Sequence, residues 1–142
     1  MNHKEFIEQL TNKVMQEKSV SLVLLVGSFA RGDYKPSSDI DLMIVTEQRE
    51  TFLQNDDFYT QFGHVDDKQL EYYGECTSVR VFYSSGIEVE FGFVDNTWLS
   101  TPLDKGTIAV LTDGYIVLYD RDQIFKRIEK EIDFSIVGKT LK

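Results

Sequence analysis

The chain has 142 residues, of which 42% are hydrophobic and 27% are charged, a composition typical of one soluble globular domain, here spanning residues 1–142. Its formal net charge of −9 excludes a nucleic-acid polymer as substrate, because a phosphate track needs a basic surface, although a local basic loop can still hold one nucleotide. A single cysteine, no signal-peptide pattern and no run of membrane-spanning length predict a cytoplasmic protein without a membrane partner.

The first predicted element is an amphipathic helix over residues 3–18. Apolar side chains recur there at helical spacing, with polar residues between them: Phe6, Ile7, Leu10, Val14 and Met15. We expect this helix to cover one face of a sheet. His3, at its start, is expected to be solvated.

Two apolar runs, residues 22–26 and 40–45, flank a polar loop that begins at Gly27 and Ser28. The pattern predicts a strand, a glycine-led turn and a second strand. Asp39 and Asp41 lie at the mouth of the second strand, and because residues two apart in a strand share a face, their side chains project side by side. Neighbouring carboxylates repel each other unless a cation lies between them, and oxygen-only ligands suit Mg²⁺ shared with substrate phosphates.

The loop between the two strands has the features of an anion site. Gly27 permits a close backbone approach, and Ser28 offers a hydroxyl and an N–H at the start of a predicted helical turn. Arg31 and Lys35 add cationic donors. A phosphate cradle beside a carboxylate pair is the outline of a phosphoryl- or nucleotidyl-transfer site. The loop lacks the endings of a P-loop or a dinucleotide fingerprint, which excludes those kinase and dehydrogenase classes.

The next segments are harder to assign. Residues 46–53 could start a helix with Thr46 as its N-cap. For residues 54–75 the simplest prediction is one or two helices with aromatic core contacts, and the alternative is a surface that faces an acceptor or a partner. Cys76 follows and is expected to be a small packed residue.

Residues 77–83 alternate as in a strand, and 84–86 form a turn into a returning strand at 87–94. Glu88 and Glu90 share one face of that strand. Taken alone, such a pair is typical of a solvent-facing edge.

The last third of the chain is predicted to contain a short helix, a turn, a strand and a final helix. Asp95 or Asn96 should cap the short helix, in which Trp98 is expected to be a core residue. Residues 107–111 are apolar, 113–114 are a turn, and 115–119 are strand-like. Asp122 is expected to cap the final helix, and residues 138–142 are expected to fray. The apolar face of that helix comprises Ile124, Phe125, Ile128 and Ile132.

Gly27 and Ser28, followed after ten intervening residues by Asp39, Ile40 and Asp41, resemble the signature of the DNA polymerase β-like nucleotidyltransferase superfamily. The likeness is strongest to its small bacterial members, the minimal nucleotidyltransferases and the aminoglycoside adenylyltransferase-like proteins. It implies an α+β fold, a mixed β-sheet flanked by helices as in the polymerase β palm, with a third carboxylate on a later strand.

The third carboxylate that the resemblance requires is assigned to Glu90. Glu90 directly precedes an apolar run, as Asp41 does. Glu88 remains the alternative.

The resemblance further implies transfer of a nucleoside monophosphate, AMP from ATP, to a hydroxyl of a small molecule or a protein. Asp39, Asp41 and Glu90 would be both catalytic and metal-binding, holding two Mg²⁺ ions. Gly27 and Ser28 would hold the β- and γ-phosphates, with Arg31 and Lys35 as further cationic contacts.

Two other functions stay open: an antitoxin that neutralises a helical toxin, and an inactive nucleotide-binding module. The helical C-terminal domain of larger relatives is not expected here. The acceptor site should therefore come from residues 46–75, a second copy of the chain or another protein, which favours a homodimer or a partner complex. The acidic composition favours a cationic acceptor.

Overall fold

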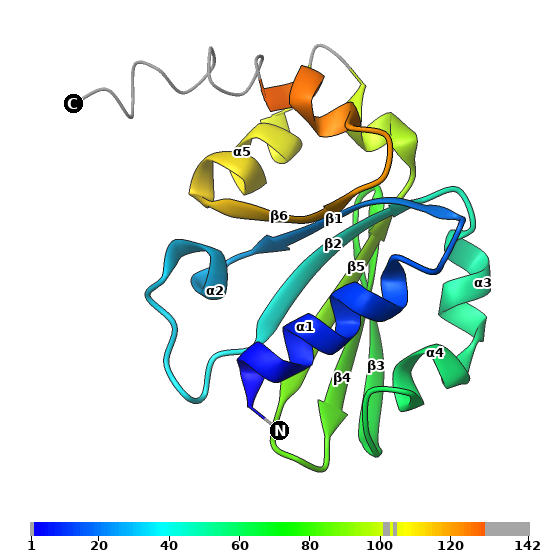
Figure 1. The fold of residues 1–142 in the computed structure, drawn as a ribbon, viewed down its shortest axis with the longest axis vertical. Coiled ribbons are helices and arrows are strands. Elements are labelled where there is room, and N and C mark those ends of the chain that lie inside the picture. The colour runs from blue at the N-terminus through cyan, green and yellow to red at the C-terminus, as the bar shows by residue number, and fades with distance from the viewer. Residues whose placement is uncertain (1, 101–102, 104, 130–142) are drawn as a thin grey trace.

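The computed structural model describes residues 2–100, 103 and 105–129, which form a β-sheet with helices packed on it (Figure 1). In chain order the elements are α1 (His3–Val14), β1 (Val20–Val26), α2 (Ser28–Arg31), β2 (Ile40–Thr46), α3 (Arg49–Gln54), α4 (Asp56–Thr60), β3 (Val65–Tyr73), β4 (Cys76–Tyr83), β5 (Glu88–Val94), the 3-10 helix η1 (Asn96–Leu99), α5 (Lys105–Asp113) and β6 (Tyr115–Asp120), followed by a helical segment at residues 124–129. None of these helices has both the length and the apolar character needed to cross a bilayer.

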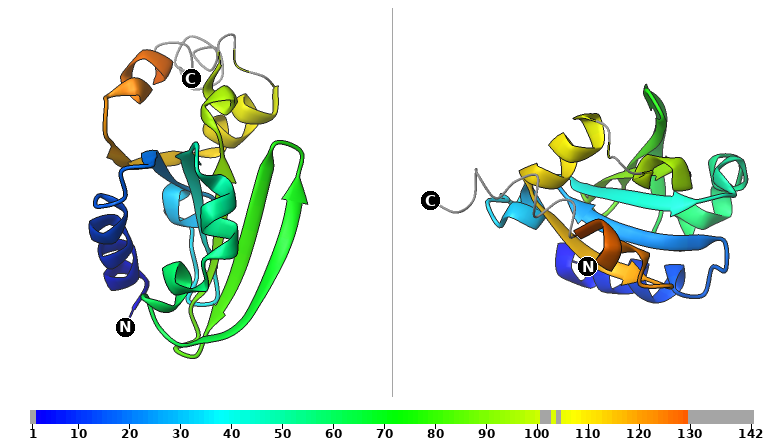
Figure 2. Two further views of the ribbon diagram at one scale, coloured as in Figure 1. Left: turned by 90° about the vertical axis from the view of Figure 1, so that its right-hand side faces the viewer. Right: turned by 90° about the horizontal axis from the view of Figure 1, so that it is seen from above.

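The strands form one sheet in the order β3-β4-β5-β2-β1-β6. The pairing of β2 with β5 is parallel, and the other described pairings are antiparallel. The predicted α+β fold with a mixed sheet is therefore confirmed. Figure 2 shows α1 and α5 on opposite sides of this sheet.

One face of the sheet is covered by α1, α3 and α4. Phe6, Leu10 and Val14 project from α1 into this layer, which explains the helical spacing of its apolar residues. Phe58 of α4 meets Phe91 of β5 edge to face, with ring centroids 5.7 Å apart. Of the aromatic residues in the segment that was hardest to assign, Phe58, Tyr59 and Phe62 are thus core residues, whereas Tyr72 and Tyr73 are exposed.

The opposite face is covered only in part. Apolar side chains of β1 and β2 form a second cluster there with Trp98 and Leu99 of η1, Leu111 of α5 and Phe125. Beyond this apolar cluster, the same faces of β2, β5 and β4 carry polar side chains that border a cavity. The functional site is therefore sought on this second face.

The main correction concerns residues 65–73, which form β3 where helices were expected. The helical expectation holds only for α3 and α4, which end at Thr60. β3 is an edge strand, and its side chains show no clean alternation of buried and exposed positions. A strand held mainly by its backbone bonds to one neighbour leaves a weak signal in the sequence.

Two of the three predicted helix caps, Thr46 and Asp122, were wrong. Asp120, and not Asp122, caps the helical segment at 124–129, because its two carboxylate oxygens accept from the N–H groups of Ile124 and Phe125 at 3.0 Å. Gln48, and not Thr46, is the N-cap of α3, although the Thr46 hydroxyl accepts from the Gln48 N–H at 3.0 Å.

Several smaller predictions can also be compared with the structure. Asp95 caps η1 as predicted, accepting from the N–H of Thr97. His3 is half-buried and packs on Phe29 with ring centroids 4.9 Å apart, so it is not simply solvated. The apolar residues 107–111 belong to α5. Ile132 and residues 138–142 lie outside the described residues.

Truncating the central aromatic side chain of the covered face should unfold the protein more readily. Phe91 is fully buried, so Phe91→Ala should lower the free energy of unfolding by about 3–5 kcal/mol, measured by urea denaturation. Leu70→Ala, on the exposed edge strand, should cost about 0.5 kcal/mol or less. Equal losses in the two variants would contradict this description of the core.

Candidate active site

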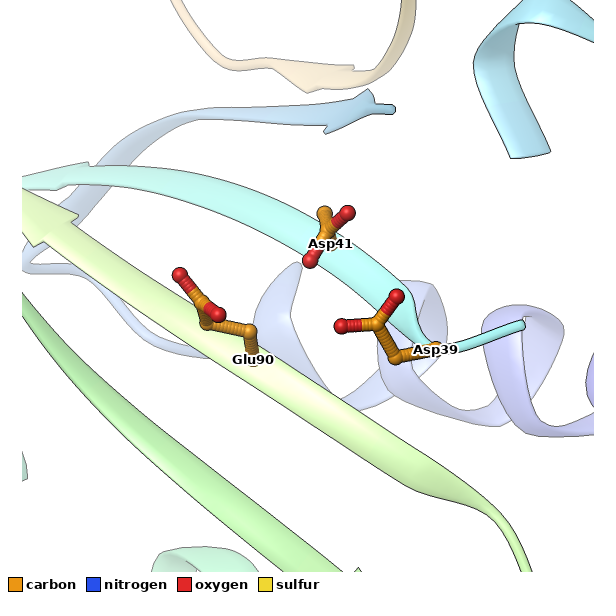
Figure 3. A group of neighbouring side chains, drawn as sticks. All are labelled: Asp39, Asp41 and Glu90. Atoms are coloured by element: carbon orange, nitrogen blue, oxygen red, sulfur yellow. The ribbon is translucent and has the colours of Figure 1, made fainter. Parts of the chain in front are cut away.

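Three carboxylates meet on the second face of the sheet, where β2 and β5 run side by side (Figure 3). Asp41 of β2 is the direct register partner of Glu90 of β5, and Asp39 lies immediately before β2. One oxygen from each of the three lies within 4.8 Å of the others. Glu88 is not part of this group. The parallel pairing thus brings together residues that are about fifty positions apart in the sequence.

Burial and neighbouring charges raise the pKa of two of the three carboxylates, Asp41 and Glu90. Burial, the charges of Asp39 and Glu90, and a hydrogen bond with Asp39 raise the pKa of Asp41 from its ordinary value of 3.8 to about 7. Burial also raises the pKa of Glu90, against the opposing effect of a nearby arginine. A divalent cation would relieve this repulsion, and three carboxylates at this spacing match the oxygen ligands that Mg²⁺ prefers.

Gly27 holds the backbone directly against Asp41. Its φ of +75° and ψ of −153° are conformations that L-residues with a side chain rarely adopt. A Cβ at this position would collide with the carboxylate of Asp41. The glycine-led turn and the acidic strand are therefore one structural unit, which explains why a glycine ends β1 here.

The turn after Gly27 closes on itself. The N–H groups of Ala30 and Arg31 donate to the carbonyl of Gly27 at 3.1 and 3.0 Å. As far as the described residues show, the N–H groups of Ser28 and Phe29 at the start of α2 have no protein acceptor. This is the arrangement that the sequence predicted for the first half of the loop.

The two predicted cationic contacts, Arg31 and Lys35, do not line the cavity on this face. The guanidinium of Arg31 pairs with Asp33 at 3.2 Å and with Asp113 at 2.5 Å. Lys35 is exposed, and its backbone N–H donates to the hydroxyl of Ser38. Of the four residues predicted to hold the nucleotide, Gly27 lines the cavity, whereas Ser28, Arg31 and Lys35 are not among its lining residues.

Arg80 of β4 is the site residue that the sequence analysis missed. Its guanidinium donates to Asp39 at 3.0 Å and to Glu71 at 3.2 Å, and it also binds Glu88 and Glu90. Burial alone would lower the pKa of Arg80, but hydrogen bonds to these carboxylates raise it. The predicted turn at 84–86 could have identified Arg80, because antiparallel pairing of the two strands that it joins places residue 80 opposite residue 90.

A cavity of about 840 Å³ opens over these residues. Its lining includes the three carboxylates and Arg80, and also the apolar side chains of Met43, Trp98 and Val110. Trp98 is both a core residue, as predicted, and a wall of the cavity. The end of the β3–β4 hairpin, residues 73–76, forms another wall. The cavity is large enough for a small-molecule ligand.

Cys76, in the hairpin wall, is half-buried. Burial raises the pKa of its thiol, which favours the unreactive protonated form. This accords with the expected small packed residue.

A sequence model described as "Nucleotidyltransferase domain" matches residues 7–91, which include Gly27, Asp39, Asp41 and Glu90. Comparison with curated proteins finds no match. Among solved structures, an aminoglycoside 6-adenyltransferase from Bacillus subtilis aligns with 16% identity and a TM-score of 0.51, over 66% of this chain and 34% of that one.

Two further solved structures align less closely. The polymerase core of TRAMP, an RNA surveillance complex, aligns with 17% identity and a TM-score of 0.47, over 63% of this chain and 29% of that one. Cid1 in complex with the UTP analogue UMPNPP aligns with 16% identity and a TM-score of 0.47, over 79% and 35%. The chain thus spans about a third of the length of the solved structures it matches, and at these identities the likeness concerns the fold alone.

The raised pKa of Asp41 makes the stability of the metal-free protein depend on pH below neutrality. Between pH 4 and 7 the folded state keeps a proton on Asp41 that the unfolded state has lost, so stability should fall as the pH rises through this window. Thermal unfolding in EDTA at several pH values measures this slope. Asp41→Asn should flatten it, and an unchanged slope in that variant would contradict the assigned cause.

Substituting Gly27 should do more harm than substituting Gly32, a matched glycine of the same loop. Both have positive φ, which costs an alanine about 1–2 kcal/mol, but a Cβ at Gly32 meets nothing within 4 Å. Gly27→Ala must also displace Asp41. In urea denaturation, the free energy of unfolding should therefore fall by about 1 kcal/mol or more beyond the fall seen in Gly32→Ala. Equal losses would mean that Asp41 is free to move away.

Proposed function

The chain belongs to the nucleotidyltransferase domain family, and we propose that it is a Mg²⁺-dependent enzyme that transfers a nucleoside monophosphate, AMP from ATP, to a hydroxyl of an acceptor. The observation that supports this proposal most directly is the group formed by Asp39, Asp41 and Glu90, with their oxygens within 4.8 Å, next to the Gly27 turn. A catalyst of this reaction needs a dense negative site for metal beside a backbone cradle for phosphates.

The metal ligands in this proposal are Asp39, Asp41 and Glu90, which would hold two Mg²⁺ ions. When bound, the metal supplies charge that stabilises the attacking and leaving oxygens of an in-line displacement. The chain's own contribution is a rigid frame: Asp41 and Glu90 are fixed by the register of two paired strands, and Asp41 is confined by Gly27. Such fixed geometry lets the site act without reorganising during the reaction.

The phosphates of the nucleotide are proposed to lie at the start of α2. There the N–H groups of Ser28 and Phe29 have no protein acceptor among the described residues, and the Ser28 hydroxyl adds another donor. Arg31 would contribute only after releasing Asp113, which lines the cavity. Lys35 would act as a nearby charge on the exposed loop and not as a direct wall of the site.

The acceptor is proposed to enter the cavity on the side of β5 and the β3–β4 hairpin. Its hydroxyl must lose a proton, and a carboxylate within reach of that hydroxyl can accept it. Asp41 and Glu90 line the cavity on this side and are the proposed acceptors of the proton. The hairpin wall includes residues 73–75, so part of the segment expected to form the acceptor site does border the cavity.

The acceptor itself, a small molecule or a protein, is left open by this proposal, as is a homodimer or a complex with a partner protein. Assembly is supported by the edge strand β3, on which Leu70, Tyr72 and Tyr73 are all exposed. An edge strand with exposed apolar side chains is a surface that a second chain can cover.

Calorimetry with ATP and Mg²⁺ tests the proposed function. The wild type should bind ATP only when Mg²⁺ is present, and the double variant Asp39→Asn/Asp41→Asn should not bind, because two of the three proposed metal ligands are lost. Glu75→Gln is the matched control: it removes a charge from the same cavity outside the carboxylate group and should bind like the wild type.

The rate of AMP transfer can then be followed with labelled ATP and candidate acceptors. Glu90→Gln should lower it by about 100-fold or more, as the loss of charge stabilisation at a reaction centre generally does. Absence of Mg²⁺-dependent ATP binding by the folded wild type would refute the proposed enzyme and favour the antitoxin alternative, in which the chain acts by binding a partner protein.

A further inference from the structure

We propose that Arg80 is a built-in counter-ion of the carboxylate site, which competes with the metal for Asp39 and Glu90 and thereby lowers the site's affinity for free divalent cations. This inference rests on the proposed function, because it assumes that the three carboxylates bind metal. It goes beyond that function by assigning a role to a residue of the neighbouring strand.

The contacts of Arg80 divide into an inner and an outer pair. The inner pair, Asp39 and Glu90, belongs to the proposed metal site, and the outer pair, Glu71 and Glu88, does not. No described hydrogen bond joins Arg80 to Asp41. The guanidinium therefore occupies lone pairs of two of the three proposed ligands, whereas the third feels its charge but accepts no described hydrogen bond from it.

The charge balance around Arg80 indicates more than a structural ion pair. One guanidinium contacts four carboxylates, and its side chain is only 19% exposed. A purely structural arginine needs one or two acidic partners, and any surplus of half-buried negative charge destabilises the fold. A surplus of this kind is expected where the protein is built to accept additional positive charge.

The outer pair, Glu71 and Glu88, can keep Arg80 hydrogen-bonded when the inner pair binds metal. Glu71 is on β3 and Glu88 is at the start of β5, so both lie on strands next to β4. Glu71 accepts from Nε, while the inner contacts use Nη1 and Nη2. The terminal nitrogens can therefore release Asp39 and Glu90 while Nε stays bonded to Glu71, and they can return when the metal leaves.

Binding of Mn²⁺ to the full chain without nucleotide, measured by electron paramagnetic resonance, tests this role. Mn²⁺ takes the same oxygen ligands as Mg²⁺. Arg80→Gln should bind Mn²⁺ about tenfold more tightly than the wild type, the order of magnitude that a unit charge exerts on a divalent ion a few ångströms away. Asp41→Asn should lose the binding in either background.

Arg49→Gln is the matched control for net charge. Arg49 lies near the same cavity and donates to the backbone carbonyl of Glu75, but it contacts none of the three carboxylates. Its removal should change the Mn²⁺ affinity by less than about threefold, because charge at greater distance is screened. Equal tightening in Arg49→Gln and Arg80→Gln would reduce the effect to net charge and overturn direct competition.

The wild type supplies an independent measurement if Arg80→Gln does not fold. The side-chain ¹⁵N signals of Arg80, assigned by comparison with Arg80→Lys, should shift when Mg²⁺ is added, because two of the four contacts are exchanged. Unchanged signals at saturating Mg²⁺, or Mn²⁺ affinity in Arg80→Gln equal to or weaker than that of the wild type, would overturn the competition. Absence of Mn²⁺ binding in both proteins would refute the metal site itself, and with it the proposed function.

Discussion

The parallel pairing of β2 with β5 is the constraint on which the site depends. It aligns Asp41 with Glu90 and forces carboxylates from distant parts of the sequence to face one another at partial burial. Left alone, such a group would repel itself apart. The surrounding structure opposes this: the strands are fixed by apolar layers on their other face, Gly27 confines Asp41, and Arg80 bridges Asp39 and Glu90. The fold thus holds together an arrangement that its electrostatics alone would disperse.

The strands that carry this constraint could be predicted from the sequence because their signals are local. β1 and β2 are apolar runs bounded by turn formers, and β5 follows a glycine turn with alternating acids. β3 gave no such signal, since its position depends on hydrogen bonds to β4 and not on burial of its own side chains. The predicted cap at Asp122 was wrong for a related reason. Asp120 and Asp122 are both plausible caps by sequence, and only the path of the chain selects Asp120.

The site shows the same division between local pattern and long-range contact. Asp39, Asp41 and Gly27 belong to one short segment, and the structure places them together; a catalytic role for them is a separate question that the proposed experiments address. Arg31 lies in the same segment, but its guanidinium pairs with Asp113, which is 82 positions away in the sequence. Arg80 was not predicted as a site residue because its contact with Glu90 depends on the register between β4 and β5. Charges whose partners are distant in sequence are the hardest to place.

The β3–β4 hairpin combines two properties that are usually separate. It stands at the edge of the sheet (Figure 2), where β4 is the one strand of the described residues that pairs with β3, and its end at residues 73–76 borders the cavity. Changes in its length or its end residues would therefore reshape one wall of the cavity while leaving the paired strands β2 and β5 in register. A lineage of such proteins could diversify what enters the cavity through this one hairpin, with the carboxylate chemistry inherited unchanged.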